Sequence, residues 1–208
     1  DKKLVSIIFN CGGVQATCYI NSLYYLLTNN YKIDKVIGIS GGCITSLAAA
    51  IYDDIDSIKE SEERVKEVHK NYTLLYSGYN FTRFLTDMCN AIFSSEDDWK
   101  KCNGRLTIVV RKRRGCVYRT HFISHFNSNK DIIEAIGCSM HIPFLFNLSF
   151  SYKGCIDGGI RLDDSIFPEH YLNIKFSKTK NHTLLRVIFE GDNEFNKTNK
   201  KEIIKLTR

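Results

Sequence analysis

The chain has 208 residues, of which 43% are hydrophobic and 25% are charged, and its net charge is +6. These proportions are ordinary for one soluble globular domain, and no apolar stretch reaches the about 18 residues that a membrane-spanning helix needs. Eight cysteines are present without a CxxC spacing, in a chain long enough to bury a large core. This favours reduced thiols in a cytosol-like compartment over a disulfide scaffold.

Strand-like and helix-like patterns alternate along the first third of the chain. The strands are continuous apolar runs, and the helices carry apolar side chains three and four positions apart. In chain order the pattern predicts a strand over 3–9, a helix over 15–29, a strand over 35–39, a helix after Ser40 and a charged helix over 57–70. Ser57 is expected to cap the charged helix, with Glu60 three residues further on.

The rest of the chain adds a mixed segment, a hairpin and two late strands. Residues 71–100 are rich in aromatic side chains and predict helical fragments. A satellite core is the favoured interpretation, and a cap or a substrate groove is the alternative. The pattern then predicts a hairpin over 105–123, a helix over 130–140, and strands over 171–176 and 184–189. Strands and helices that alternate at the start of a chain favour an α/β sandwich.

The densest positive charge lies in the predicted hairpin, where Arg111, Lys112, Arg113 and Arg114 precede Gly115. A solvated turn is the favoured interpretation, because charged turns are common. An anionic partner, either nucleic acid or acidic lipid, is the alternative that the net positive charge leaves open. No nucleic-acid-binding motif surrounds the cluster, so we expect no nucleic-acid partner.

The segment GISGG places Ser40 between glycines, where the second expected strand ends and a helix begins. It fits the pattern G-x-S-x-G, in which a sharp strand-to-helix turn strains the backbone of the serine and exposes its hydroxyl. Neighbouring atoms crowd such a turn, so glycine is needed at Gly38 and Gly42. The free amides of the following helix favour negative charge at the same point. Ser40 is therefore the candidate nucleophile.

A nucleophilic serine also needs an oxyanion hole and a base. Gly12 and Gly13 follow the first strand as Ser40 follows the second. If the two strands are neighbours, the amides of this glycine pair face an oxygen bonded to Ser40. Asp157 follows a short β-like segment and precedes two glycines, and desolvation in a cleft would raise its pKa and make it a better base.

A histidine base is the alternative to a carboxylate that acts directly. Asp157 followed by His170 or His182 keeps the Ser, Asp, His order of α/β-hydrolases. Several strands precede the nucleophile in that fold, whereas few elements precede it here, so the topology disfavours a triad. His121 and His125 are four positions apart without a third ligand in view, and we expect neither a metal site nor a cofactor.

Three stretches in this order, CGGVQA after the first strand, then GISGG, then DGG, resemble the patatin-like phospholipase family. The segment GCSMHIP, residues 137–143, is similar to the family's segment before the aspartate strand. The resemblance covers about residues 4–176 and implies one patatin-like domain over residues 1–208. It also implies a three-layer α/β/α sandwich with a mainly parallel central sheet, and a Ser40–Asp157 dyad without histidine.

The resemblance assigns further motif positions around the dyad. The family's oxyanion loop, usually G-G-G-x-R/K-G, here has Cys11 at its first glycine, Gln15 at its basic position and Ala16 at its last glycine. The glycines that match the family's motifs are Gly12, Gly13, Gly38, Gly42, Gly158 and Gly159. Because the missing basic residue weakens the electrostatic support of the hole, a non-catalytic lipid-binding module of the same fold is the alternative function.

The resemblance implies a lipid acyl hydrolase of phospholipase A or lysophospholipase type. Its substrate would be a phospholipid or another acyl lipid, cleaved through an acyl intermediate on Ser40. Positive charge would help the protein dock on anionic lipid, so we expect a cytoplasmic protein that associates peripherally with membranes. Some members of the family need a protein activator, and no motif here indicates one.

Overall fold

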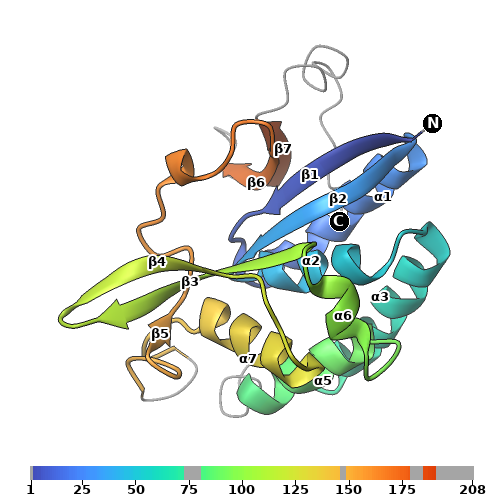
Figure 1. The fold of residues 1–208 in the computed structure, drawn as a ribbon. Helices are drawn as coiled ribbons and strands as arrows, with labels where there is room; N and C mark the ends of the chain where they lie inside the picture. The colour runs from blue at the N-terminus through green and yellow to red at the C-terminus, as the bar shows by residue number, and fades with distance from the viewer. Residues whose placement is uncertain (1, 73–80, 146–148, 179–184, 191–208) are drawn as a thin grey trace.

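The computed structural model describes residues 2–72, 81–145, 149–178 and 185–190 (Figure 1). Within them a seven-stranded sheet has the order β4-β3-β2-β1-β6-β7, and β5 pairs with β3. The strands are β1 Lys3–Phe9, β2 Tyr31–Ile39, β3 Leu106–Arg114, β4 Val117–Ile123, β5 Cys155–Ile156, β6 Leu172–Lys178 and β7 Leu185–Glu190. The helices are the 3-10 helix Gly13–Cys18, α1 Tyr19–Thr28, α2 Gly42–Ile51, α3 Ile55–Lys70, α5 Phe81–Ile92, α6 Asp98–Cys102, α7 Asn129–Met140 and the short 3-10 helix Asp164–Ile166.

The four central strands of the sheet, β3, β2, β1 and β6, run parallel to one another. The antiparallel strands β4, β5 and β7 pair at the two sides of this parallel centre. Phe9 pairs with Gly38, and Ile39 pairs with Val109, so β1, β2 and β3 reach the same edge of the sheet at their carboxyl halves. The expectation that the first two strands are neighbours is confirmed.

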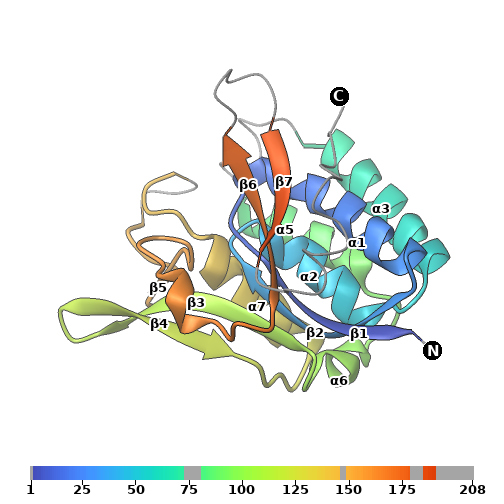
Figure 2. The same cartoon turned by 90° about the horizontal axis from the view of Figure 1, so that it is seen from above.

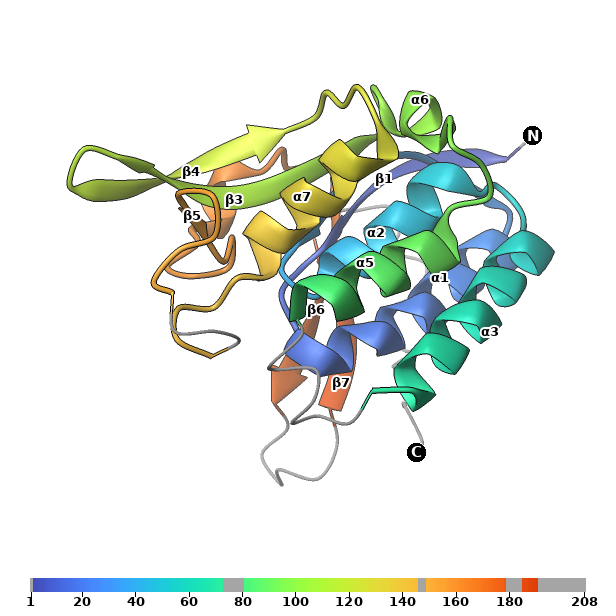
Figure 3. The same ribbon diagram turned by 90° about the horizontal axis from the view of Figure 1, so that it is seen from below.

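Helices pack on the sheet in two tiers (Figures 2 and 3). Helices α1, α2 and α7 contact the strands directly, while α3 and α5 pack against each other. The larger apolar core lies between sheet and helices, and Phe9, Tyr19 and Leu47 are fully buried there. A smaller cluster, which includes Ile39 and Phe167, lies apart from it. The predicted α/β sandwich with a mainly parallel central sheet is confirmed.

The local predictions agree with the structure except at some helix starts and at β2, which begins at Tyr31 and not at residue 35. The helix expected over 15–29 begins as a 3-10 turn and becomes α-helical only at Tyr19. The charged helix α3 begins at Ile55, and the Asp54 side chain accepts a hydrogen bond from the Ser57 amide at 2.8 Å. The prediction that Ser57 is the cap is therefore wrong, because Asp54 has the extended backbone of a cap and its carboxylate reaches the third helical amide.

The aromatic segment 71–100 forms part of the main core as far as the structure describes it. Helix α5 buries Phe81, Leu85 and Ile92 in the larger cluster. Helix α5 therefore joins the larger core rather than forming a satellite core, and residues 73–80 lie outside the described part of the chain. Among the helices described, none combines the length and the apolar character that crossing a bilayer requires.

Candidate active site

Ser40 lies at the turn between β2 and α2, at the carboxyl edge of the sheet. Its φ angle is +52°, in the left-handed region of the backbone that residues other than glycine rarely adopt. A residue held in this conformation stores strain. The turn is crowded, because a Cβ atom at Gly42 would lie 2.2 Å from the Phe9 carbonyl oxygen and one at Gly38 would lie 2.8 Å from Cys43 Cα. Glycine is thus required at both positions because neighbouring backbone atoms leave no room for a side chain, as the pattern predicts.

Ser40 and Asp157 meet in this structure although they lie 117 positions apart in the sequence. Ser40 Oγ donates a hydrogen bond to Asp157 Oδ2 at 2.6 Å, and Asp157 Oδ1 accepts one from the Gly159 amide at 2.8 Å. The exposed fractions of Ser40 and Asp157 are only 6% and 4%. Burial raises the pKa of Asp157 above its ordinary value, against the opposing effects of its two hydrogen bonds and of His141. The carboxylate is thus placed to take the proton of the hydroxyl.

Backbone hydrogen bonds hold the Asp157 loop between β3 and the end of α7. Strand β5 pairs with β3, with Ile156 opposite Arg111. The Asp157 amide then donates to the His141 carbonyl at 2.8 Å. A Cβ atom at Gly158 would lie 2.1 Å from the Val109 carbonyl oxygen, so only glycine allows this loop to lie so close to β3.

Ser139 connects the nucleophile to the sheet, a role that the sequence analysis missed. Its buried Oγ accepts a hydrogen bond from the Ser40 amide at 2.9 Å and donates one to the Val109 carbonyl at 2.6 Å. Its own carbonyl accepts from the Gly158 amide at 3.0 Å. The available signal was a polar residue on the buried side of α7, three and seven positions after the buried Ile136 and Ile132.

The glycine pair of the expected oxyanion hole lies beside the same turn. A Cβ atom at Gly41 would lie 2.3 Å from the Gly13 carbonyl oxygen, and one at Gly159 would lie 2.9 Å from Cys11 Cβ. The loop after β1 therefore contacts both the nucleophile turn and the loop of Asp157. The use of the Gly12 and Gly13 amides as oxyanion donors stays a prediction.

Comparison with known families identifies the family of this chain. A family model described as patatin-like phospholipase matches residues 7–168. The chain belongs to this family. The matched segment includes Ser40 and Asp157, so patatin-like membership indicates a hydrolase that acts on lipids. No curated protein matches the chain significantly.

The histidines of this patatin-like protein lie in different settings. His141 is buried, and its Nε2 atom lies 3.2 Å from the Ser149 carbonyl oxygen. His170 is exposed and packs on the Tyr171 ring. Among the residues described, the Ser40 hydroxyl forms its hydrogen bond with the carboxylate and with no imidazole. His182 lies outside the described residues.

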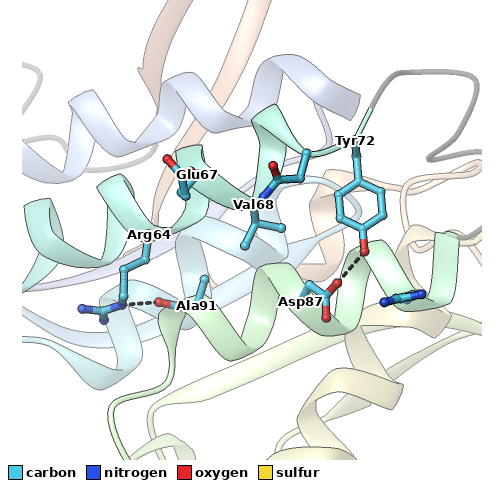
Figure 4. Close-up of a pocket in the computed structure, with 8 residues that line it drawn as sticks. Arg64, Glu67, Val68, Tyr72, Asp87 and Ala91 are labelled. Atoms are coloured by element: carbon cyan, nitrogen blue, oxygen red, sulfur yellow. Dashed lines mark hydrogen bonds between the residues drawn. The ribbon is translucent and has the colours of Figure 1, made fainter.

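A groove of about 630 Å³ lies between α3 and α5 of the patatin-like protein, away from Ser40 (Figure 4). Two hydrogen bonds join its sides: Arg64 Nε donates to the Ala91 carbonyl at 2.8 Å, and the Tyr72 hydroxyl donates to Asp87. None of the predicted site residues lines this groove. The candidate active site is therefore the Ser40–Asp157 pair at the sheet edge.

Proposed function

We propose that the protein hydrolyses fatty acyl esters of phospholipids or lysophospholipids, with Ser40 as nucleophile and Asp157 as base. The observation that carries this proposal is the 2.6 Å hydrogen bond from Ser40 Oγ to Asp157 Oδ2. The strained turn at Ser40 supports it, because such turns are used to present a nucleophile. Family membership supports the lipid class of the substrate.

The proposed reaction has two halves that use the same two side chains. Asp157 takes the proton of Ser40 while Oγ attacks the ester carbonyl carbon, and the resulting oxyanion accepts hydrogen bonds from the Gly12 and Gly13 amides. The carbon–oxygen bond to the alcohol then breaks, and the alcohol leaves with the proton from Asp157. A water molecule gives its proton to Asp157 and attacks the acyl carbon, which releases the fatty acid and returns the proton to Ser40.

The setting of Asp157 suits this role. A carboxylate with an ordinary pKa is a weak base at neutral pH, and burial raises the pKa of Asp157 toward the working range. The Gly159 amide holds the second oxygen, so that Oδ2 stays directed at Ser40. Because the substrate is a lipid, we also propose peripheral association with membranes of the cytoplasm, which the net charge of +6 favours on anionic lipid.

Fatty acid release from mixed-lipid vesicles tests the proposal. Wild type is expected to release fatty acid, and Ser40→Ala should abolish both this release and labelling by a fluorophosphonate probe. Asp157→Asn should lower kcat by about 10²–10⁴-fold, the usual contribution of a general base. The exposed Asp34 supplies the matched control, because Asp34→Asn removes a carboxylate from the amino half of β2, whereas Ser40 follows the carboxyl end of that strand.

Each rival function has its own result in this assay. Vesicle binding by wild type without any fatty acid release would assign the protein as a non-catalytic lipid-binding module. A loss of turnover in His170→Ala or His182→Ala comparable to that in Asp157→Asn would replace the dyad by a triad. Under our proposal both histidine variants keep most of the activity.

A further inference from the structure

The hairpin of β3 and β4 extends away from the body of the molecule (Figure 1). Ile39, directly before Ser40, pairs with Val109, and β3 continues from there to Arg114. Those five further residues correspond to about 17 Å of extended chain. The hairpin therefore projects beyond the edge of the sheet at which Ser40 lies.

The projecting part of the hairpin is strongly cationic. Residues 106–123 contain no Asp or Glu, and Lys112, Arg113, Arg114 and Arg119 are all exposed. Lys112 and Arg119 are direct partners across the two strands, an arrangement of like charges that destabilises a hairpin. Within the ranges that the structure describes, none of these four cations forms an ion pair. The charge is thus left for an anionic partner to neutralise.

A group of exposed apolar side chains contacts this cationic hairpin through Phe150. Phe144, Leu145 and Phe150 have exposed fractions of 63%, 60% and 50%. The Phe150 ring contacts Phe144 at 5.7 Å and Tyr118 of β4 at 5.8 Å between centroids. The apolar group therefore packs beside the hairpin. Surfaces that bind anionic membranes typically combine apolar side chains with neighbouring cations.

Both parts of this surface are joined to the backbone around Asp157. Arg111, at the base of the cationic run, pairs with Ile156, the residue before Asp157. On the other side, the His141 carbonyl binds the Asp157 amide, and the chain reaches Phe144 three residues later. A lipid surface held by these groups would lie at the carboxyl edge of the sheet, where Ser40 is.

We propose that these groups form a docking surface for an anionic lipid bilayer, which directs the Ser40 edge of the sheet toward the membrane. This inference rests on the proposed function for its purpose, but docking itself does not require turnover. Cations would contact the headgroups while the aromatic side chains enter the interface. The docking surface comprises Lys112, Arg113, Arg114, Arg119, Phe144, Leu145 and Phe150.

Sedimentation with vesicles tests the docking surface in full chains that carry Ser40→Ala, so that no lipid is consumed. Vesicles of phosphatidylcholine are compared with vesicles in which about a third of the lipid is phosphatidylserine. We expect binding to the anionic vesicles that weakens as salt is added. Replacing Lys112 and Arg119 together by alanine should lower partitioning of the protein onto the anionic vesicles about 30-fold, because each cation contributes about fivefold.

The matched control is Lys32→Ala with Lys35→Ala. Both lysines are exposed on β2, and Lys32 pairs with Leu4 near the start of β1, at the far edge of the sheet from Ser40. This variant loses the same charge and should keep wild-type partitioning. A loss of binding equal to that of the hairpin variant would show that net charge alone acts, and would overturn the proposed surface.

A second variant separates docking from folding. Lys112→Glu turns the like-charge pair with Arg119 into an opposite-charge pair, so its resistance to urea should equal or exceed that of wild type while vesicle binding falls. Phe144→Ser with Phe150→Ser should reduce binding further in the anionic vesicles. Wild-type vesicle binding in these variants overturns the proposal.

Two further results would distinguish a nucleic-acid partner from a lipid partner, and docking from catalysis. If Lys112→Glu lowers binding to a single-stranded RNA oligonucleotide but not to anionic vesicles, the surface belongs to nucleic acid and the proposal fails. If the vesicle results hold but the protein with Ser40 intact releases no fatty acid, the docking surface stands and the proposed hydrolase function fails. Docking and catalysis are thus tested separately.

Discussion

The hydroxyl of Ser139 offers the sharpest test of how the structure holds its nucleophile. Ser139→Ala removes the hydrogen bond that the hydroxyl accepts from the Ser40 amide at 2.9 Å and the one that it donates to the Val109 carbonyl at 2.6 Å. Both partners are backbone groups of buried residues. An unpaired buried polar group costs about 1–3 kcal/mol, so the two groups together should lower the free energy of unfolding by about 2–6 kcal/mol.

The same substitution should also slow the reaction in protein that remains folded. Ser40 has a φ angle of +52°, and the Ser139 hydroxyl binds the amide of that strained residue. Without this bond the nucleophile can move away from Asp157, and a misplacement of about 1 Å costs about 100-fold in rate. We therefore expect kcat and the rate of fluorophosphonate labelling to fall by about 10–100-fold, with little change in KM.

Urea unfolding measures the first effect, and steady-state kinetics on a soluble ester well below the unfolding midpoint measure the second. Ser61→Ala is the matched control, because Ser61 is equally buried in α3 and its hydroxyl donates only to the Ile58 carbonyl at 2.8 Å. It should cost no more than about 1.5 kcal/mol and leave kcat unchanged. If Ser139→Ala loses stability but keeps the wild-type labelling rate, Ser139 has no positioning role; if it also keeps wild-type stability, the reasoning from unpaired groups fails.

Four further predictions concern the site and its scaffold. Because burial raises the pKa of Asp157 and the reaction needs its ionised form, kcat/KM should rise with pH through a midpoint above the ordinary value of 3.8, and a midpoint at or below that value would contradict the assignment. Asp157 has a higher pKa in the folded protein than in the unfolded chain, so at pH values between the two its ionisation lowers the free energy of unfolding as pH rises. Asp157→Asn should therefore flatten the pH dependence of urea unfolding in that pH range. Gly42→Ala places a Cβ atom 2.2 Å from the Phe9 carbonyl oxygen and should yield little folded protein on expression, whereas wild-type thermal stability would show that the turn relaxes freely. Asp54→Ala removes the α3 cap and should lower the free energy of unfolding by about 1 kcal/mol in urea without changing kcat.

Several features of this protein could be read from local sequence because their causes are local. The apolar run at 3–9, the hairpin over 105–123 and the helix over 130–140 are all present close to their predicted bounds. The spacing of apolar residues indicates which side chains of an element are buried, and this spacing is a property of the element's own sequence. The glycines around Ser40 likewise indicate a strained turn from the local sequence alone.

Other features depended on which elements become neighbours. The carbonyl oxygen that excludes a side chain at Gly42 comes from Phe9 on another strand. The glycines after Asp157 and the family resemblance both indicated this carboxylate as the base, but only the packing of β5 on β3 and the His141 carbonyl bring it to Ser40. The role of Ser139 could not be derived from the segment GCSMHIP, because both partners of its hydroxyl lie on distant elements.

The sequence by itself determined the alternating elements, the nucleophile turn and the glycines that make the turn possible. Only the tertiary structure decided that Ser40 meets Asp157, that one serine hydroxyl joins the nucleophile to β3, and that the cationic hairpin extends past the site. The physical reason is that backbone preferences act over a few residues. The distance between groups separated by 117 positions is instead set by the packing of whole strands and helices.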